Sequence, residues 1–196
     1  MDGLSASLAS RNEHKARELA RAMPGWQIEL LDADEFPEEA GATYYENARA
    51  KARFGRMTCE LDVWMIGEDS GIEVDVLGGR PGIESARWAE DGVGRLLREL
   101  EGVEGESRAA RYVCELVCLS PELEEFRGTG VLEGRIAEER GGSEGFGYDP
   151  IFVPDGETRT VAELGNGWKA EHSHRARAAR ALLEALAARA VRSAGR

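Results

Sequence analysis

Segments with the two-residue period of a strand alternate with helix-like segments along the whole chain, and this alternation constrains the fold most. Ile72-Glu73-Val74-Asp75-Val76 alternates apolar and acidic residues, as a half-buried strand does. Thr43-Tyr44-Tyr45-Glu46 has the pattern of a capping box and predicts a helix that runs to about Arg56. We find no internal repeat, low-complexity segment or linker. The pattern therefore predicts a mixed α/β fold with a single domain over residues 1–196.

Several other segments have strand or helix features. Short apolar runs bounded by turn residues predict strands at residues 4–9, 64–67, 110–119, 125–132, 134–138 and 151–153. Start and stop signals predict helices at residues 13–23, 94–100 and 173–191. Cys114 and Cys118 are four residues apart in one strand candidate, so we expect them to share a face and to pack in the core.

The charge and the cysteines exclude several classes of protein. The formal net charge is -12 at pH 7. Nucleic-acid binding needs a basic footprint, so we expect no nucleic-acid partner, although Mg²⁺ would still allow an acidic chain to bind a nucleotide. Three cysteines without a CxxC spacing indicate neither a disulfide framework nor a zinc site. Without a signal peptide or an apolar stretch of roughly 18 residues, we expect a soluble, cytoplasmic protein with no membrane partner.

Lysine is rare in this chain, and each lysine stands beside a suggestive motif. The chain has 22 arginines but only three lysines, Lys15, Lys51 and Lys169. Lysine carries a compact, flexible ammonium and arginine a planar guanidinium, so the two are not interchangeable. Three point charges from distant segments suggest a polyphosphate site. The alternative is a few exposed lysines without a shared role.

A candidate phosphate-binding segment joins the first predicted strand to the first predicted helix. It reads Ser10-Arg11-Asn12-Glu13-His14-Lys15. The N-terminus of a helix offers N–H groups without intrahelical partners and a partial positive charge, and Lys15 would add a full charge there. A capping box formed by Ser10 and Glu13 explains those two residues equally well without any ligand.

Two acidic segments are candidate metal ligands. Glu38 and Glu39 precede the predicted helix that carries Lys51, and we favour Glu38 over Glu46 as a ligand because Glu46 already serves the capping box. The alternative for residues 38–39 is a solvated acidic loop. Glu68 and Asp69 follow the apolar run 64–67, where adjacent carboxylates can hold Mg²⁺ and activate a water. The alternative there is a polar turn between two strands.

The last candidate site combines residues 141–152 with residues 169–175. Gly145-Phe146-Gly147-Tyr148-Asp149-Pro150 places aromatic rings between glycines, so that both backbone and ring can approach a flat ligand. Stacking of a base on such a ring contributes roughly 1–3 kcal/mol. His174 and Arg175 follow Ser173, the expected N-cap of the last helix, in a first turn where the helix dipole disfavours cations. The alternative is that Arg175 begins a solvated, arginine-rich face.

Six motifs occur in one order along the chain. They are Ser10-x-Asn12-x-x-Lys15, Gly41-x-Thr43-x-x-Glu46-Asn47-Ala48-x-x-Lys51-Ala52, Asp69-Ser70-Gly71-Ile72-x-Val74, Gly79-x-Pro81-Gly82-x-x-Ser85-Ala86-Arg87, Gly145-Phe146-Gly147-Tyr148-Asp149-Pro150-Ile151-Phe152 and Lys169-x-x-x-Ser173-His174-Arg175. In these motifs the chain resembles the inosine/xanthosine triphosphate pyrophosphatase family over nearly its whole length. It departs from the family at Ser10-Arg11, where members usually have a threonine and then a small residue.

This resemblance implies a fold and an activity. The implied fold is an elongated mixed β-sheet with flanking helices and two lobes around an active-site cleft, in a homodimer. The implied activity is Mg²⁺-dependent hydrolysis of purine nucleoside triphosphates such as ITP, dITP and XTP to the monophosphate and pyrophosphate, which cleanses the nucleotide pool. Water would attack the α-phosphorus in line, so positioning and charge stabilisation would provide most of the catalysis.

The resemblance also implies roles for particular residues. Asp69 would be the catalytic carboxylate and a metal contact, with Glu38 as the second metal contact and Glu68 able to share the metal. The triphosphate and sugar would be held by Ser10, Arg11, Asn12, Glu13, His14, Lys15, Lys51 and Ser70. The base would be framed by Phe146, Gly147, Tyr148, Asp149, Lys169, His174 and Arg175.

Two other functions stay open. A Maf-like pyrophosphatase acting on other modified nucleotides would use similar side chains, although the loop 146–149 argues against it. A catalytically silent nucleotide-binding protein is the other, and Asp69 with the three lysines argues against it. Pyrophosphate release across a panel of nucleoside triphosphates separates the three.

Overall fold

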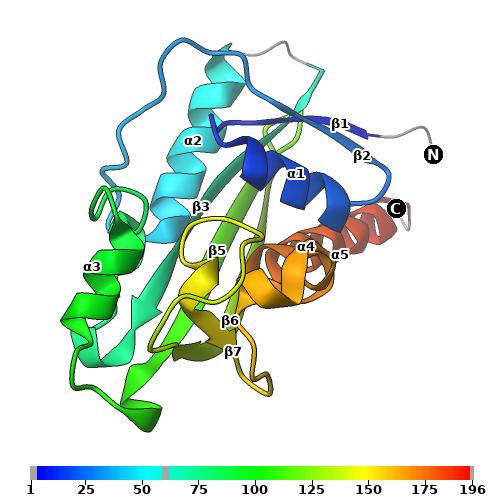
Figure 1. Ribbon diagram of the computed structural model, residues 1–196. Coiled ribbons are helices and arrows are strands. Elements are labelled where there is room, and N and C mark those ends of the chain that lie inside the picture. The colour runs from blue at the N-terminus through cyan, green and yellow to red at the C-terminus, as the bar shows by residue number, and fades with distance from the viewer. Residues whose placement is uncertain (1–3, 59–61, 195–196) are drawn as a thin grey trace. The chain divides into compact units, whose positions relative to one another are not determined.

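A seven-stranded sheet forms the centre of the fold in the computed structural model, which describes residues 4–58 and 62–194 (Figure 1). The strand order is β2-β1-β3-β5-β6-β7, and β4 pairs with β3. The strands are β1 (Leu4–Leu8), β2 (Trp26–Leu30), β3 (Trp64–Val74), β4 (Arg80–Pro81), β5 (Ala109–Leu119), β6 (Glu125–Ile136) and β7 (Phe152–Pro154). β1 is parallel to both β2 and β3, whereas β4 and β7 are antiparallel to β3 and β6. The expected mixed α/β fold is confirmed.

Side-chain caps define where several helices begin. The α-helices are α1 (Glu13–Ala22), α2 (Tyr44–Thr58), α3 (Gly92–Glu99), α4 (Val161–His172) and α5 (His174–Ala194), and 3₁₀ helices lie at η1 (Asp75–Leu77), η2 (Gly82–Glu84), η3 (Gly105–Arg108) and η4 (Asp149–Ile151). The Asn12 side chain accepts from the N–H groups of His14 and Lys15, so Asn12, and not Ser10, caps α1. The capping box of Thr43 and Glu46 is confirmed at α2. No helix in the described ranges is both long and apolar enough to cross a membrane.

Two predicted strand boundaries were wrong, and two elements were missed. β3 runs without interruption through residues 68–71, where a polar turn was an alternative. β6 is one strand, although residues 125–132 and 134–138 suggested two. A Cβ at Gly134 would overlap the carbonyl oxygen of Val153, so this glycine allows β7 to approach and does not end the strand. β2 and α4 were not predicted, although Thr160 and Glu163 form a capping box at α4.

The described residues divide into two compact units. Unit 1 contains residues 4–58, 62–69, 114–130 and 175–194, and unit 2 contains residues 70–113 and 131–174. The expected single domain and the cleft between two lobes stay predictions. Cys59 lies outside the described residues.

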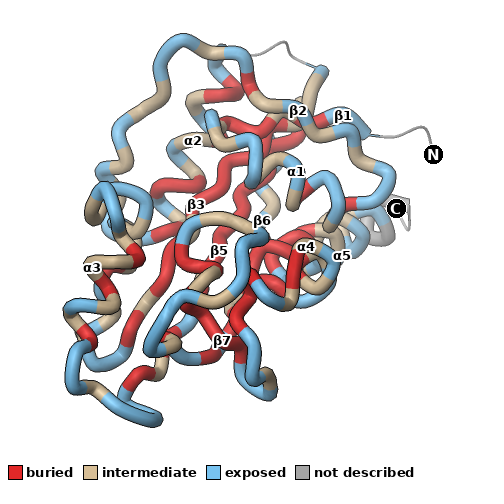
Figure 2. The backbone as a smooth tube through the Cα atoms, in the orientation of Figure 1, coloured by how far each residue is buried: buried red, intermediate tan, exposed pale blue. Residues whose placement is uncertain are grey.

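Each unit has its own apolar core, which follows the red segments of Figure 2. In unit 1, strands and the helices α1 and α5 contribute Ala6, Leu8, Leu19, Met23, Ile66, Cys114, Leu116, Cys118, Ala178, Ala179 and Leu182. In unit 2 the core contains Ile72, Val74, Val93, Leu96, Leu100, Ala110, Tyr112, Leu132, Ile136, Tyr148, Ile151, Phe152 and Val161. Cys114 and Cys118 pack in the core, as expected.

Gly128 allows β6 to approach α5 closely, and we expect that a methyl group there would destabilise unit 1. A Cβ at Gly128 would overlap the carbonyl oxygen of Ala178 and lie 2.7 Å from the Leu182 nitrogen. Because backbone atoms cannot rotate aside, Gly128→Ala should lower the free energy of unfolding by about 1–3 kcal/mol. Urea unfolding followed by circular dichroism measures this difference.

Gly167→Ala is the matched control, since a Cβ at Gly167 meets nothing within 4 Å. Alanine favours a helix by about 0.8–1 kcal/mol over glycine, so this variant should be as stable as the unmutated protein or more so. Equal midpoints for the Gly128 variant and the unmutated protein would contradict the close approach.

Candidate active site

Asp69 lies at the centre of a group of polar side chains in unit 1, here called the Asp69 cluster: Asp69, Asn47, Lys51 and Glu39. Asn47 Nδ2 donates to Asp69 Oδ2 over 3.0 Å, and Lys51 Nζ donates to Asp69 Oδ1 over 3.1 Å. Lys51 also forms an ion pair with Glu39. Asn47 and Lys51 are one turn apart on α2, and this spacing brings both to the same carboxylate. Two carboxylates thus surround one ammonium group.

Close packing of α2 on β3 holds the Asp69 cluster in place. A Cβ at Gly67 would overlap the carbonyl oxygen of Ala48, so the glycine before Glu68 lets the helix backbone approach the strand. Asn47 Oδ1 accepts from the Gly41 nitrogen over 2.8 Å. This bond orients the Asn47 amide, because it leaves the Nδ2 donor for Asp69. The Asp69 carboxylate is therefore positioned by groups that are themselves fixed.

Glu68 forms a second group in unit 1, here called the Glu68 cluster: Glu68, Lys15, Arg175, Glu18 and Cys114. Glu68 Oε2 lies 2.5 Å from Lys15 Nζ, and Glu68 Oε1 accepts from Arg175 Nη2 over 2.8 Å. Cys114 Sγ contacts the same Oε1 at 3.5 Å. Arg175 also pairs with Glu18. Glu68 and Arg175 are each 1% exposed, so this is a buried ionic network.

The two neighbouring carboxylates differ in their proton affinity. Burial raises the pKa of Asp69 above its ordinary value, although Lys51 and Asn47 oppose the shift. Burial would also raise the pKa of Glu68, but Lys15 and Arg175 outweigh it and hold that pKa well below the ordinary value. Glu68 is therefore ionised near pH 7, whereas Asp69 is the better proton acceptor. Carboxylates whose environments separate their pKa values in this way take different chemical roles.

Asp149 organises a third group, in unit 2, here called the Asp149 cluster: Asp149, Lys169, Phe146 and Tyr112. Asp149 Oδ2 accepts from Lys169 Nζ over 2.6 Å and from the Phe146 nitrogen over 2.8 Å. Asp149 Oδ1 accepts from the Tyr112 hydroxyl over 3.3 Å. Lys169 Nζ lies 4.6 Å from the centroid of the Phe146 ring. An aromatic face, a cation and a carboxylate thus lie together.

Tyr148 and His174 are also held by contacts inside unit 2. The Tyr148 hydroxyl donates to the Ser85 carbonyl over 3.0 Å, and burial raises the pKa of Tyr148 to about 12. The His174 ring stacks on Tyr112, with centroids 4.5 Å apart. Tyr148 and Gly147 border a hollow of about 350 Å³ that Ser85 also lines. The phenol of Tyr148 is therefore neutral near pH 7, and the structure fixes both rings.

Local hydrogen bonds shape the predicted phosphate-binding segment, residues 10–15. Ser10 Oγ accepts from the Asn12 nitrogen over 3.1 Å, and Asn12 in turn caps α1. Arg11 donates to the Asp34 carbonyl. Glu13 and His14 are exposed, and Ser70 is half-buried on β3 directly after Asp69. Within residues 10–15, Lys15 is the residue whose side chain belongs to the Glu68 cluster.

Three functional candidates had no assigned role in the sequence analysis. Glu39 contacts Lys51, whereas the favoured Glu38 is exposed. Glu18 pairs with Arg175 from the first helix, and Tyr112 contacts Asp149 from within a strand. No periodicity marks these residues, because each acts through a partner that is distant in sequence. Which of the predicted site residues bind a ligand stays a prediction.

The Asp69 cluster has donors that suit a hard cation. Among the residues that the structure describes, no three His, Cys, Asp or Glu side chains form a preassembled metal site. Mg²⁺ does not need one, because it usually takes one or two carboxylates and completes its shell with waters and phosphate oxygens. Asp69 and Glu39, which both pair with Lys51, are carboxylates of this kind. The residues present therefore fit Mg²⁺ bound together with a phosphate ligand.

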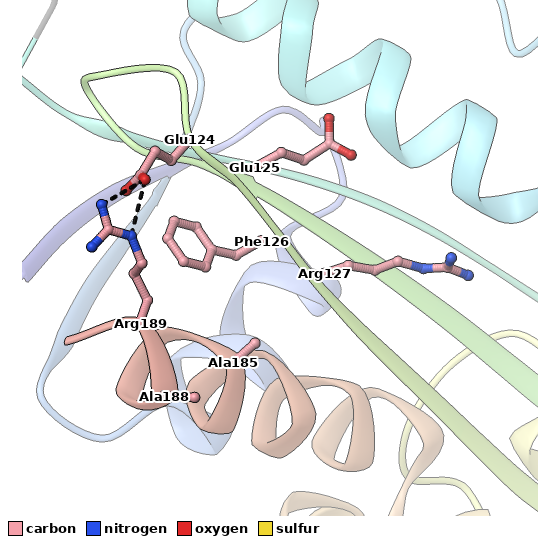
Figure 3. A pocket seen from close by; sticks show the side chains of 7 residues that line it. All are labelled: Glu124, Glu125, Phe126, Arg127, Ala185, Ala188 and Arg189. Atoms are coloured by element: carbon pink, nitrogen blue, oxygen red, sulfur yellow. Dashed lines mark hydrogen bonds and ion pairs between the residues drawn. The ribbon is translucent and has the colours of Figure 1, made fainter. Parts of the chain in front are cut away.

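A larger hollow in unit 1, of about 560 Å³, contains none of the predicted site residues (Figure 3). It lies between the start of β6 and α5 and is lined by Glu124, Glu125, Phe126, Arg127, Ala185, Ala188 and Arg189. Its charged side chains already have partners: Arg189 pairs with Glu124, and Tyr45 donates to Glu125. We therefore do not place the candidate active site in this hollow.

The chain is similar in sequence and structure to one group of known proteins. The sequence model of the Ham1 family matches residues 6–185. A dITP/XTP pyrophosphatase from Symbiobacterium thermophilum is 45% identical over 189 residues, which covers 92% of this chain and 94% of the relative. A dITP/XTP pyrophosphatase from Bacillus licheniformis is 42% identical over 186 residues, which cover 89% of this chain and 94% of the relative. The Staphylococcus aureus Ham1 protein has a TM-score of 0.81 at 33% identity, covering 94% and 99% of the two chains.

Asp69→Asn should stabilise the protein at neutral pH. The raised pKa of Asp69 means that the folded state favours the protonated form. The contribution of the Asp69 carboxyl group to stability is complete at pH values below 3.8, the ordinary pKa of aspartate. It is lost as the pH rises through the pKa of Asp69 in the folded state. Removing the charge should therefore raise the urea midpoint at pH 7, and the gain should vanish below pH 3.8. Urea titrations at several pH values measure it.

Glu68→Gln is the matched comparison, and its effect should have the opposite sign. The pKa of Glu68 is lowered, so its contribution to stability is fully present at pH values above 4.5, the ordinary pKa of glutamate. It is lost as the pH falls through the pKa of Glu68 in the folded state. The variant leaves Lys15 and Arg175 without their shared carboxylate and should lose about 3–5 kcal/mol at pH 7. Shifts of the same sign for both variants at pH 7 would contradict this assignment.

Proposed function

The chain belongs to the Ham1 family, and from this premise we propose that it hydrolyses purine nucleoside triphosphates such as ITP, dITP and XTP to the monophosphate and pyrophosphate. The observation that carries the proposal is the Asp69 carboxylate, which is buried, has a raised pKa and lies between Asn47 and Lys51. The relatives named dITP/XTP pyrophosphatase favour this function over the two alternatives. Its role would be to cleanse the nucleotide pool.

Asp69 would accept the proton of the attacking water. Asn47 keeps one oxygen of the carboxylate oriented, which fixes the group that would take up the proton. The water attacks the α-phosphorus, the bond to the bridging oxygen breaks, and pyrophosphate leaves with the electron pair. Lys51 and Lys15 would stabilise the phosphate charge, because a triphosphate competes with carboxylates for their ammonium groups.

We propose that Mg²⁺ binds with the triphosphate, held by Asp69 and Glu39. When bound, it would supply a Lewis acid that neutralises phosphate oxygens. We prefer Glu39 to Glu38 because Glu39 shares the Lys51 ammonium with Asp69, whereas Glu38 is exposed. Mg²⁺ bound between these carboxylates would allow an acidic protein to receive an anionic substrate.

The Asp149 cluster of unit 2 supports recognition of the base. The Phe146 ring is half-buried and can stack on a purine, while Lys169 beside it is a donor. A 6-keto purine accepts a hydrogen bond from such a donor, whereas adenine presents an amino group. Roles for His174 and Arg175 in reading the base stay a prediction.

We further propose a cytoplasmic homodimer, on the family resemblance alone. Sedimentation of the purified protein at micromolar concentration distinguishes a dimer from a monomer.

The function is tested by pyrophosphate release from ITP, XTP, GTP and ATP in the presence of Mg²⁺. An unsatisfied buried donor costs about 1–3 kcal/mol, so we expect kcat/KM for ITP and XTP to exceed that for ATP by about 5- to 150-fold. Equal cleavage of ITP and ATP would exclude the proposed base selection. Release of single phosphates in place of pyrophosphate would exclude the proposed bond cleavage.

Asp69→Asn should lower kcat for ITP by at least about 10²-fold, because asparagine cannot accept the proton. The control is Glu46→Gln, which should keep its activity, since glutamine can still accept from the Thr43 nitrogen in the capping box. A stable Asp69 variant that turns over normally would remove Asp69 from the mechanism.

Glu39→Gln should raise the Mg²⁺ concentration needed for half-maximal activity by about 10-fold or more, as expected for a lost ligand of a metal with few protein ligands. The comparison is Glu38→Gln, whose effect should be clearly smaller. A larger effect of Glu38→Gln would return the ligand role to Glu38.

A further inference from the structure

Tyr112 connects two of the residues expected to frame the base. Its hydroxyl donates to Asp149 Oδ1 over 3.3 Å. Its ring stacks on the His174 imidazole with centroids 4.5 Å apart and planes 12° apart. Phe152 packs against the same ring, with centroids 4.5 Å apart. One side chain on β5 thus contacts η4, β7 and the first residue of α5, all within unit 2.

Tyr112 belongs to a buried group of side chains next to Phe146. Tyr112 is 6% exposed, as is His174, and Asp149 is 2% exposed. Phe146, in contrast, is half-buried. A purine can therefore reach Phe146, while Tyr112, Asp149 and His174 form a buried group beside it.

The two contacts of Tyr112 fix torsions that are otherwise loosely defined. The χ2 angles of Asp and His have broad, roughly two-fold preferences, so a carboxylate or an imidazole needs external contacts to select one plane. For Asp149, Lys169 and the Phe146 nitrogen both bind Oδ2, and the Tyr112 hydroxyl binds Oδ1. Donors on both oxygens define the plane of the carboxylate. For His174, the stacked phenol defines the plane of the ring.

We propose that Tyr112 is a positioning residue for base recognition, which sets the planes of the Asp149 carboxylate and the His174 imidazole. This inference rests on the proposed function, because it assumes that these two residues lie at the base. Precise orientation matters in such a site, since hydrogen bonds weaken steeply when donor and acceptor are misaligned. Tyr112 would thus affect how tightly a base is held without touching it.

The test compares a ligand with a base to one without. IMP and ribose 5-phosphate share the sugar phosphate and differ in the base, and calorimetry gives the dissociation constant of each in the presence of Mg²⁺. Tyr112→Phe removes the hydroxyl and keeps the stacked ring. It should weaken IMP binding by about 3- to 10-fold, the range expected for one lost hydrogen bond, and leave ribose 5-phosphate binding within about twofold.

Two further variants separate positioning from packing. Tyr112→Leu also loses the stack and should weaken IMP binding more than Tyr112→Phe does. Phe152→Leu removes core packing against Tyr112 and serves as the matched control, with thermal midpoints measured for all variants. It should leave the ratio of the two dissociation constants unchanged.

Steady-state kinetics give the second readout. For Tyr112→Phe, KM for ITP should rise by about 3- to 10-fold while kcat stays within about twofold. Unchanged IMP binding in Tyr112→Phe, or an equal loss for ribose 5-phosphate or in Phe152→Leu, would overturn the inference. If the unmutated protein releases no pyrophosphate from ITP, the proposed function fails, and the IMP comparison alone decides the role of Tyr112.

Discussion

The buried ion pairs of Glu68 are the interaction on which unit 1 depends. A carboxylate that is 1% exposed is stable as an anion only when cations replace the water it has lost, and Lys15 and Arg175 provide them. These two residues belong to α1 and α5, so one carboxylate fixes the starts of both helices against β3. Asp69 then follows on the opposite face of the strand. On that face the Asp69 carboxylate is held by Asn47 and Lys51 of α2.

Local signals predicted some elements, and tertiary partners decided the others. The capping box at Thr43 needs only its own turn, so the sequence predicted α2 correctly. The sequence placed residues 68–71 after the end of a strand, with a polar turn as an alternative reading, because acids and small residues are rare inside strands. They are a strand interior because Lys15, Arg175 and Lys51 neutralise the acids from helices that are distant in sequence. No local pattern contains that information.

In the candidate site, too, the sequence indicated what local spacing determines and missed what contacts between distant residues determine. The four-residue spacing of Asn47 and Lys51 places both on one face of α2, and the structure shows that they meet one carboxylate there. Spacing could not separate Glu38 from Glu39, because the segment before α2 is irregular and only the contact with Lys51 distinguishes the two. Tyr112 had the appearance of a core residue in an apolar strand. Its contact with Asp149, 37 residues further along the chain, exists only in the folded protein.

The uninterrupted course of β3 limits how a gene for such a chain can change in length. Side chains alternate across a strand, so deletion of one codon between Trp64 and Glu68 would exchange the faces of all later residues. Asp69 would then meet α1 and α5, and Glu68 would meet α2. Insertions and deletions are far better tolerated in irregular segments such as residues 31–43. Across related genes, β3 should therefore vary by substitution while the loop before α2 varies in length.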